Sequence, residues 1–108
     1  MVTVERRVAD TLERVGTALA DPTRRRILLE LLDGPAYPAD LADALGAGRS
    51  NISNHLACLR GCGLVTTTRE GRQVRYDLAS AKLRAALAKL ATVELEVDTR
   101  HADLDGGW

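Results

Sequence analysis

Apolar residues recur every three or four positions over most of the chain, which is the spacing of an amphipathic helix. The first such stretch carries Val8, Leu12, Val15 and Leu19, and the positions between them are mainly charged or small. Further stretches repeat the pattern and are separated by glycine, proline and aspartate residues, which commonly begin or end helices. The spacing predicts helices over residues 4–20, about 22–33, about 38–46, 49–62 and 80–98.

One part of the chain departs from this helical spacing and predicts a β-hairpin. Residues 64–68 are rich in β-branched side chains, and residues 73–78 alternate between polar and apolar positions, as strands do. Residues 69–72 form the expected turn. We therefore predict a mainly α fold with a small β-hairpin: a single winged helix-turn-helix domain over residues 1–108, with the helix-turn-helix at 38–62 and the wing at 64–78.

Short polar residues mark the predicted helix starts. Asp21 stands directly before Pro22, which suits an N-cap followed by proline at the first helical position. Ser50 is the expected cap of the helix over 49–62, and the last helix is expected to start at Ser80. Gly46 is expected to end the helix over 38–46.

The helix over 49–62 has the composition of a recognition helix. Apolar Ile52, Leu56 and Leu59 define one buried face. The positions between them carry short hydroxyl and amide side chains, which form helices poorly but suit hydrogen bonding to base edges and phosphates. The alternative is an ordinary surface helix, in which the Ser/Asn cluster serves only to cap the N-terminus. The predicted DNA contacts on this helix are Arg49, Ser50, Asn51, Ser53, Asn54 and His55.

Charge is segregated along the chain although the formal net charge is zero. Residues 49–75 hold five arginines and one acid, whereas residues 94–105 hold five acids and one arginine. Three arginines flank the predicted wing turn, and we expect Arg69, Arg72 and Arg75 to lie along DNA phosphates or enter the minor groove. For the three arginines at residues 24–26 the sequence leaves two alternatives open, which are contact with phosphate and a solvated helix face.

The composition indicates the oligomeric state and the cellular compartment to expect. The chain has three aromatic residues and no Phe, so its core has to be aliphatic, and such a small core often gains stability from dimerisation. The helices over 4–20 and 80–98 are the expected dimerisation elements, and the tail over 99–108 is expected to be flexible. No apolar run reaches membrane-spanning length and no signal peptide precedes the first helix. We expect a cytoplasmic protein without a membrane partner.

The two cysteines, Cys58 and Cys62, are four residues apart on the predicted recognition helix. Both thiols therefore project from one helix face, and thiolates are soft ligands for transition and heavy metals. The alternative to a metal site is that both cysteines are small buried residues that bind no ligand. A disulfide within the helix would require the helix to distort.

The chain carries four motifs that can be compared with known families, at residues 19–28, 50–56, 59–65 and 71–76. They resemble the ArsR/SmtB family of bacterial repressors, and the resemblance extends over roughly residues 8–98. The resemblance implies a homodimeric winged helix-turn-helix repressor that binds double-stranded operator DNA, is released by an inducer such as a metal ion, and has no catalytic activity. Within the family, the chain is most similar to the branch that senses cadmium and lead.

The resemblance also implies a metal site. In that branch, cysteines at the positions of Cys58 and Cys62 are metal ligands and a third cysteine comes from the C-terminal tail. The tail here has no cysteine, and the nearest candidate ligands are His101 and Asp103. This ligand set shifts the expected inducer toward zinc, nickel or cobalt and away from the all-sulfur coordination that suits lead, with cadmium still a candidate.

Two other functional readings remain open from the residues alone. The first is a winged-helix transcriptional regulator controlled by thiol oxidation or by a regulatory protein partner, without a metal inducer. The second is a helical module that mediates protein assembly and does not bind DNA. The arginine-flanked wing disfavours the second, and steep salt dependence of DNA binding would distinguish it.

Overall fold

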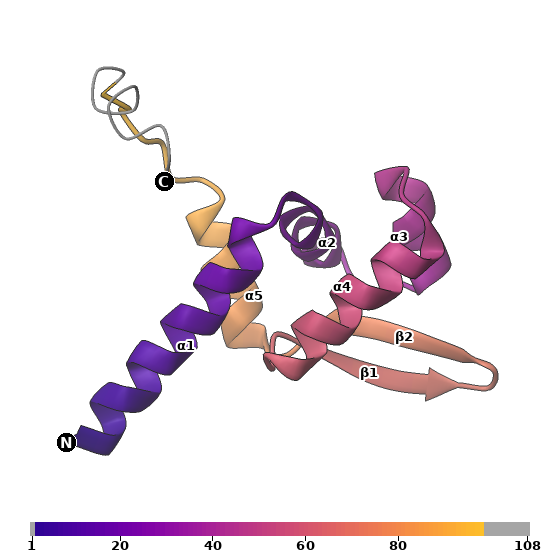
Figure 1. Ribbon diagram of the computed structural model, residues 1–108, viewed down its shortest axis with the longest axis horizontal. Helices are drawn as coiled ribbons and strands as arrows, with labels where there is room; N and C mark the ends of the chain where they lie inside the picture. The colour runs from indigo at the N-terminus through magenta and orange to yellow at the C-terminus, as the bar shows by residue number, and fades with distance from the viewer. Residues whose placement is uncertain (1, 99–108) are drawn as a thin grey trace.

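The computed structural model describes residues 2–98, and it shows five helices with one antiparallel hairpin between the fourth and fifth (Figure 1). The winged helix-turn-helix fold predicted from the sequence is therefore confirmed. Helix starts and ends fall within two residues of their predicted positions, except at the end of the last helix. The elements are α1 (Val2–Ala20), α2 (Pro22–Leu32), α3 (Pro38–Leu45), α4 (Arg49–Gly61), β1 (Val65–Glu70), β2 (Gln73–Leu78) and α5 (Ala81–Leu90).

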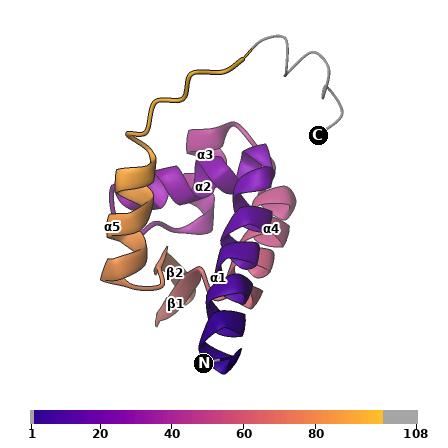
Figure 2. The ribbon, with the colours of Figure 1, turned by 90° about the vertical axis from the view of Figure 1, so that its left-hand side faces the viewer.

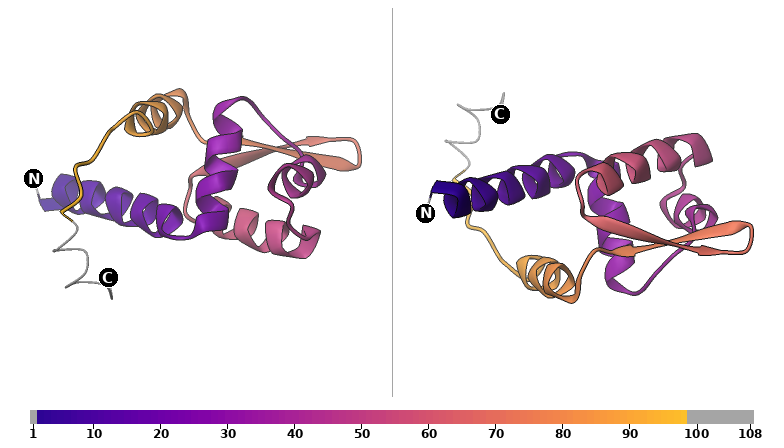
Figure 3. Two further views of the ribbon diagram at one scale, coloured as in Figure 1. Left: turned by 90° about the horizontal axis from the view of Figure 1, so that it is seen from above. Right: turned by 90° about the horizontal axis from the view of Figure 1, so that it is seen from below.

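The elements separate into two ends that are joined by α2. The hairpin, α3 and the start of α4 gather at one end, and the N-terminal part of α1 extends to the other (Figure 3). Figure 2 shows α1 and α5 on opposite flanks of the molecule, with α2 between them. The helix-turn-helix and the wing thus share one end of the domain, where they can contact a common ligand.

The core is aliphatic throughout, as the scarcity of aromatic residues requires. Helix α2 contacts α1, α3, α4, α5 and β2, so it is the shared packing surface of the domain. Strand β1 reaches the core through Val65 and β2 through Leu78. The largest side chains with almost no exposure are Ile27, Leu31, Leu41, Ile52, Leu56 and Leu59.

Helix α1 is the longest helix, with 19 residues, and only its C-terminal part is packed. Ala18 is buried, and Val15 and Leu19 lie against the core. Val8 and Leu12 belong to the same apolar stripe but are 55% and 66% exposed. Charged residues interrupt the stripe, and no helix among residues 2–98 is long and apolar enough to span a bilayer.

Side-chain caps start two helices as the sequence predicted. The Asp21 carboxylate accepts a hydrogen bond of 2.9 Å from the backbone N–H of Arg24, and the Ser80 hydroxyl accepts one of 3.1 Å from the N–H of Leu83. The predicted cap at Ser50 is wrong: α4 begins at Arg49, and its N-cap is Gly48, which has no side chain to accept a bond. Ser50 is left free on the exposed surface of the first turn.

The last helix is shorter than predicted. Its spacing of apolar residues continues to Val97, but α5 ends at Leu90, and residues 93–98 form neither helix nor strand. Two features explain the difference. The same residues also alternate between apolar and acidic at period two, so their pattern is not specific for a helix. In addition, Val93, Leu95 and Val97 are 54–80% exposed, so no packing within the chain stabilises a further turn.

The wing has a tighter turn than predicted. The strands pair in register from Val65 opposite Leu78 to Glu70 opposite Gln73, so residues 69 and 70 belong to β1 and the turn contains only two residues. Gly71 has a φ of +62°, which a residue without Cβ adopts without strain. The base of the wing is fixed by Ala36, whose N–H and C=O both bond to the backbone of Tyr76, at 2.9 and 2.8 Å.

The cap at Asp21 predicts a pH-dependent stability. The hydrogen bond from Arg24 N–H, and to a lesser extent the charge of His55, lowers the pKa of the Asp21 carboxyl below its ordinary value of 3.8. A lowered native pKa stabilises the fold above the unfolded pKa, and the contribution disappears as the pH falls through the native value. We expect Asp21→Ala to reduce the free energy of unfolding at about pH 7, and the deficit to shrink below about pH 3.8.

Urea unfolding followed by circular dichroism across this pH range measures the effect. Asp43→Ala is a matched control, because Asp43 lies exposed on α3 and its side chain makes no hydrogen bond or ion pair with residues 2–98. A deficit of Asp21→Ala that stays constant with pH would contradict the role assigned to the ionised carboxylate.

Candidate nucleic-acid interface and thiol pair

Helix α4 keeps one polar surface exposed because its apolar side is fully buried. Ile52, Leu56 and Leu59 each have 0% of their surface exposed, and the helix packs against α2, α3 and β1. A helix fixed by three such contacts on one side cannot rotate about its axis without opening the core. The predicted DNA-contacting residues that the structure leaves exposed on α4 are Arg49, Ser50, Asn51, Ser53 and Asn54.

His55 differs from its neighbours on α4 because it is half-buried. Its Nδ1 lies 3.7 Å from Oδ2 of Asp21, and the exposed fraction of its side chain is 19%. The imidazole is therefore directed toward the junction of α1 and α2, where Asp21 caps α2. The structure separates His55 from the exposed polar residues with which the sequence grouped it.

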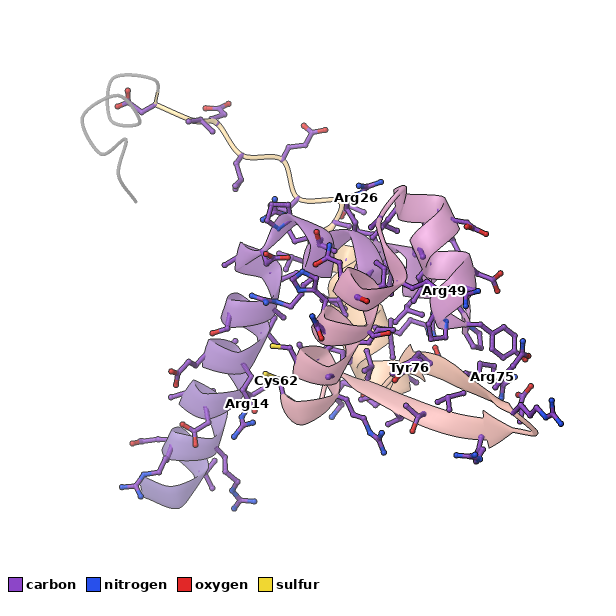
Figure 4. The ribbon with its side chains drawn as sticks, turned by 45° about the vertical axis from the view of Figure 1, so that its right-hand side comes forward. Arg14, Arg26, Arg49, Cys62, Arg75 and Tyr76 are labelled. Atoms are coloured by element: carbon purple, nitrogen blue, oxygen red, sulfur yellow. The ribbon has the colours of Figure 1, made fainter. Side chains whose placement is uncertain are left out.

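The start of α4 and the wing lie on the same side of the molecule. Figure 4 shows Arg49 near α3 and the hairpin, and Arg75 toward the tip of the hairpin. The N-terminus of a helix carries unpaired N–H groups and a partial positive charge. Basic side chains and a helix N-terminus together make this end of the domain suitable for a polyanion such as a DNA backbone.

The three wing arginines are not equivalent. Arg69 and Arg72 are exposed, and their side chains make no hydrogen bond or ion pair with the residues that the structure describes. Arg75 is half-buried, and its Nε lies 3.1 Å from Oε1 of Glu70. In this structure Arg69 and Arg72 are available to phosphates, whereas the guanidinium of Arg75 pairs with the Glu70 carboxylate.

Glu70 also joins the wing to the helix-turn-helix. Its Oε2 accepts a hydrogen bond of 2.6 Å from the hydroxyl of Tyr37, the residue that precedes α3 as its N-cap. This bond to a carboxylate raises the pKa of the Tyr37 phenol above its ordinary value of 10.0. The sequence does not predict this contact, and the only feature that points to it is one acid between arginines at the wing tip.

The arginine run over residues 24–26 has a role that neither sequence-based alternative included. Each guanidinium donates to backbone carbonyls at or near the end of another helix. Arg24 bonds to Thr17 O at 2.8 Å, Arg25 to Leu19 O at 2.7 Å and Ala20 O at 3.2 Å, and Arg26 to Leu45 O at 3.2 Å. The run thus stabilises the C-terminal ends of α1 and α3, whose carbonyls have no partner within their own helices.

Cys58 and Cys62 are both free and half-buried. Cys62 is the C-cap of α4 and lines two pockets of about 260 and 220 Å³ on the side of α1, each of which is also lined by Arg14. Figure 4 shows Arg14 and Cys62 close together between α1 and α4. The larger pocket also includes the carboxylates of Asp10 and Glu13.

Within residues 2–98, no group of three or more His, Cys, Asp or Glu side chains is arranged to hold a metal ion. The two thiols fit a soft metal ion by their chemistry, but a complete ligand set needs at least one further donor. His101 and Asp103, which the sequence analysis named as further ligands, lie outside the described residues.

Comparisons with known proteins agree with this arrangement. Residues 21–67 match the family described as bacterial regulatory protein, arsR family. The transcriptional regulator CmtR of Mycobacterium tuberculosis is 62% identical over 99 residues, which cover 92% of this chain and 83% of CmtR.

Solved structures give the same result. The NMR structure of the cadmium metal-sensor CmtR from M. tuberculosis is 64% identical, covers 80% of this chain and 90% of that chain, and has a TM-score of 0.66. A homodimeric winged helix-turn-helix DNA-binding domain from Mycobacterium bovis is 27% identical, with a TM-score of 0.75 and coverage of 94% and 89%. The chain is therefore a member of the ArsR family of bacterial transcriptional regulators.

Proposed function

We propose that this protein is a homodimeric repressor that binds operator DNA through α4 and the wing and is released by a metal ion bound at Cys58 and Cys62. The observation that carries the proposal is the placement of both sites on α4. The helix exposes its polar residues at the end shared with the wing, and it carries Cys58 in its last turn and Cys62 as its C-cap. Assignment to a family of regulators disfavours a catalytic role.

The DNA-binding part of the proposal assigns different roles to α4 and the wing. The exposed amides and hydroxyls of α4 can read base edges in the major groove, where an Asn side chain pairs with adenine through two hydrogen bonds. The exposed Arg69 and Arg72 neutralise phosphates or enter the minor groove. His55, which contacts Asp21, acts by holding α4 against the α1–α2 junction. A regulator of this type works in the cytoplasm, where the bacterial chromosome lies.

The dimer is supported by apolar surface that the single chain leaves uncovered. Val4, Val8 and Leu12 are 55–66% exposed along one side of α1. A second apolar surface, a pocket of about 220 Å³, lies between α2 and α5 and is lined mainly by leucines, including Leu29 and Leu90. Exposed apolar stripes of this kind are typical of protein–protein interfaces. A two-fold dimer would present two copies of α4 to a palindromic operator.

Metal binding would act on the helix that contacts DNA. Thiolates of Cys58 and Cys62 would hold a soft metal ion, with further ligands from the tail at His101 or Asp103. The bound ion would fix the end of α4 relative to the tail. Only about 1–3 kcal/mol of coupling is needed to change operator occupancy substantially. Arg14 lies beside Cys62, and its positive charge opposes a cation there, so Arg14 has to move away when metal binds.

Base readout by α4 predicts a difference between specific and non-specific DNA. We expect Asn54→Ala to weaken binding to the protein's own upstream promoter region by roughly tenfold and to leave binding to an unrelated duplex almost unchanged. Arg72→Ala, by contrast, should weaken binding to both duplexes and lower the salt slope by about one. Fluorescence anisotropy titrations at several salt concentrations measure both effects. Equal losses on the two duplexes for Asn54→Ala would refute base readout.

The dimer interface is tested by placing a charge on the exposed stripe of α1. Leu12→Glu should convert the protein to a monomer and abolish operator binding, because a buried unpaired carboxylate is costly at an interface. Arg6→Glu is the matched control, since helical spacing places residue 6 on the opposite side of α1 from residues 4, 8 and 12. Light scattering coupled to size-exclusion chromatography gives the mass. A dimeric Leu12→Glu protein would exclude α1 from the interface.

Metal release is tested with the double variant Cys58→Ser, Cys62→Ser. We expect it to bind the promoter as tightly as the parent protein in the absence of metal and to lose the response to added metal. Titrations with zinc, nickel, cobalt, cadmium and lead in turn identify the inducer. The chain has no other cysteine, so a response that survives the double substitution would exclude a thiolate site. A parent protein that ignores all five metals would instead favour a thiol-oxidation switch or a regulatory protein partner.

A further inference from the structure

Glu70 is the only acid among residues 65–76, a segment that contains three arginines, and both of its carboxylate oxygens are engaged. Oε2 accepts the hydrogen bond from the Tyr37 hydroxyl at 2.6 Å, and Oε1 lies 3.1 Å from Nε of Arg75. Tyr37 is 33 residues away in the sequence. The network therefore connects the end of β1 to the residue from which the helix-turn-helix begins.

The base of the wing is held without this network. Val65 and Leu78 are buried in the core, and Ala36 makes two backbone hydrogen bonds to Tyr76. The tip has no such support, because all residues from 68 to 73 are exposed. A two-stranded ribbon is only marginally stable without packing, so the contact between Tyr37 and Glu70 restrains the part of the wing that carries the free arginines.

The same carboxylate controls which arginines are available. In the register of the hairpin, Glu70 opposes Gln73 and Thr68 opposes Arg75, so Glu70 and Arg75 share one face of the ribbon. Arg69 lies on the opposite face, since successive side chains alternate, and Arg72 lies in the turn. Glu70 thus pairs with one arginine and leaves the other two unpaired.

We propose that Tyr37 and Glu70 are positioning residues for the wing: Tyr37 holds the tip in place for DNA, and Glu70 keeps Arg75 from binding phosphate. This inference rests on the proposed DNA-binding function. It assigns opposite effects to two substitutions in one network. Tyr37→Phe removes the restraint on the tip. Glu70→Gln keeps a carbonyl oxygen that accepts the tyrosine hydrogen bond but removes the charge that pairs with Arg75.

The test compares these two variants with the control Tyr76→Phe. Tyr76 lies on the same hairpin, and its hydroxyl makes no hydrogen bond with residues 2–98, so the control removes the same atom without breaking a contact. Binding to the upstream promoter duplex and to an unrelated duplex of equal length is followed by fluorescence anisotropy between about 50 and 200 mM salt.

We expect Tyr37→Phe to weaken promoter binding by about threefold to tenfold, the range that corresponds to one net hydrogen bond. Glu70→Gln should tighten binding to both duplexes and steepen the salt dependence by about one counterion, because Arg75 becomes free to contact phosphate. Tyr76→Phe should bind like the parent protein. In the DNA-free protein, Tyr37→Phe should accelerate hydrogen exchange of amides 69–74 and leave those at the base of the wing unchanged.

The outcomes separate this inference from the proposed function. If Tyr37→Phe and Glu70→Gln both weaken DNA binding, or both leave it unchanged, the network has a structural role only. Either result would overturn the inference, while the DNA-binding function would stand. Equal losses for Tyr37→Phe and Tyr76→Phe would also overturn it. If the parent protein binds neither duplex at any salt concentration, the proposed function fails and the positioning role fails with it.

Discussion

The packing of the other four helices and of β2 on α2 is the constraint on which this domain depends. Helix α2 contacts each of the other four helices and β2, and its Ile27, Leu28 and Leu31 are buried. The orientation of α4 relative to the wing is therefore set by this short aliphatic surface together with the direct contact between α4 and β1. No Phe is present to fill gaps, so close fitting of leucine and isoleucine side chains has to fix this orientation.

Arginine side chains strengthen this arrangement at the ends of the helices. Arg25 bonds to carbonyls at the end of α1 and Arg26 to one at the end of α3. Arg84 of α5 in turn donates to Leu31 O and Leu32 O, at the end of α2, and pairs with Asp77 of β2. The count of arginines consequently overstates the free basic surface. Only the arginines whose guanidinium groups make no such bond within residues 2–98 leave their full charge available to a polyanion.

Sequence periodicity was sufficient to predict α4 because burial follows the periodicity closely there. Ile52, Leu56 and Leu59 repeat at helical spacing and are all fully buried, so both the position of α4 and the side that faces the core could be predicted. Prediction failed where the pattern admitted two structures, as at residues 93–98, whose apolar positions fit both a helix and a strand. It also failed at Ser50, because a glycine two residues earlier serves as the N-cap.

The candidate site was less predictable because contacts between distant residues decide which side chains are available to DNA. His55 and Arg75 are residue types that commonly contact DNA, but each lies beside a carboxylate, that of Asp21 for His55 and that of Glu70 for Arg75. Neither pairing follows from local spacing, since His55 lies 34 positions after Asp21 in the chain, and the Glu70–Arg75 contact depends on the register of the hairpin. Arg69 and Arg72, whose side chains make no hydrogen bond or ion pair with residues 2–98, remain predicted DNA contacts.

The relation between the thiols and the wing follows from their places on the fold. Cys58 and Cys62 lie at the C-terminal end of α4, where Cys62 lines a pocket beside α1, whereas Tyr37, Glu70 and Arg75 lie around the opposite end, near α3. In the proposed function, a ligand at the thiols would therefore have no direct contact with the wing and would have to act by moving α4. Because the buried Ile52, Leu56 and Leu59 hold α4 against the core, a small displacement at its C-terminal end would move the whole helix, including the exposed residues that are proposed to contact DNA.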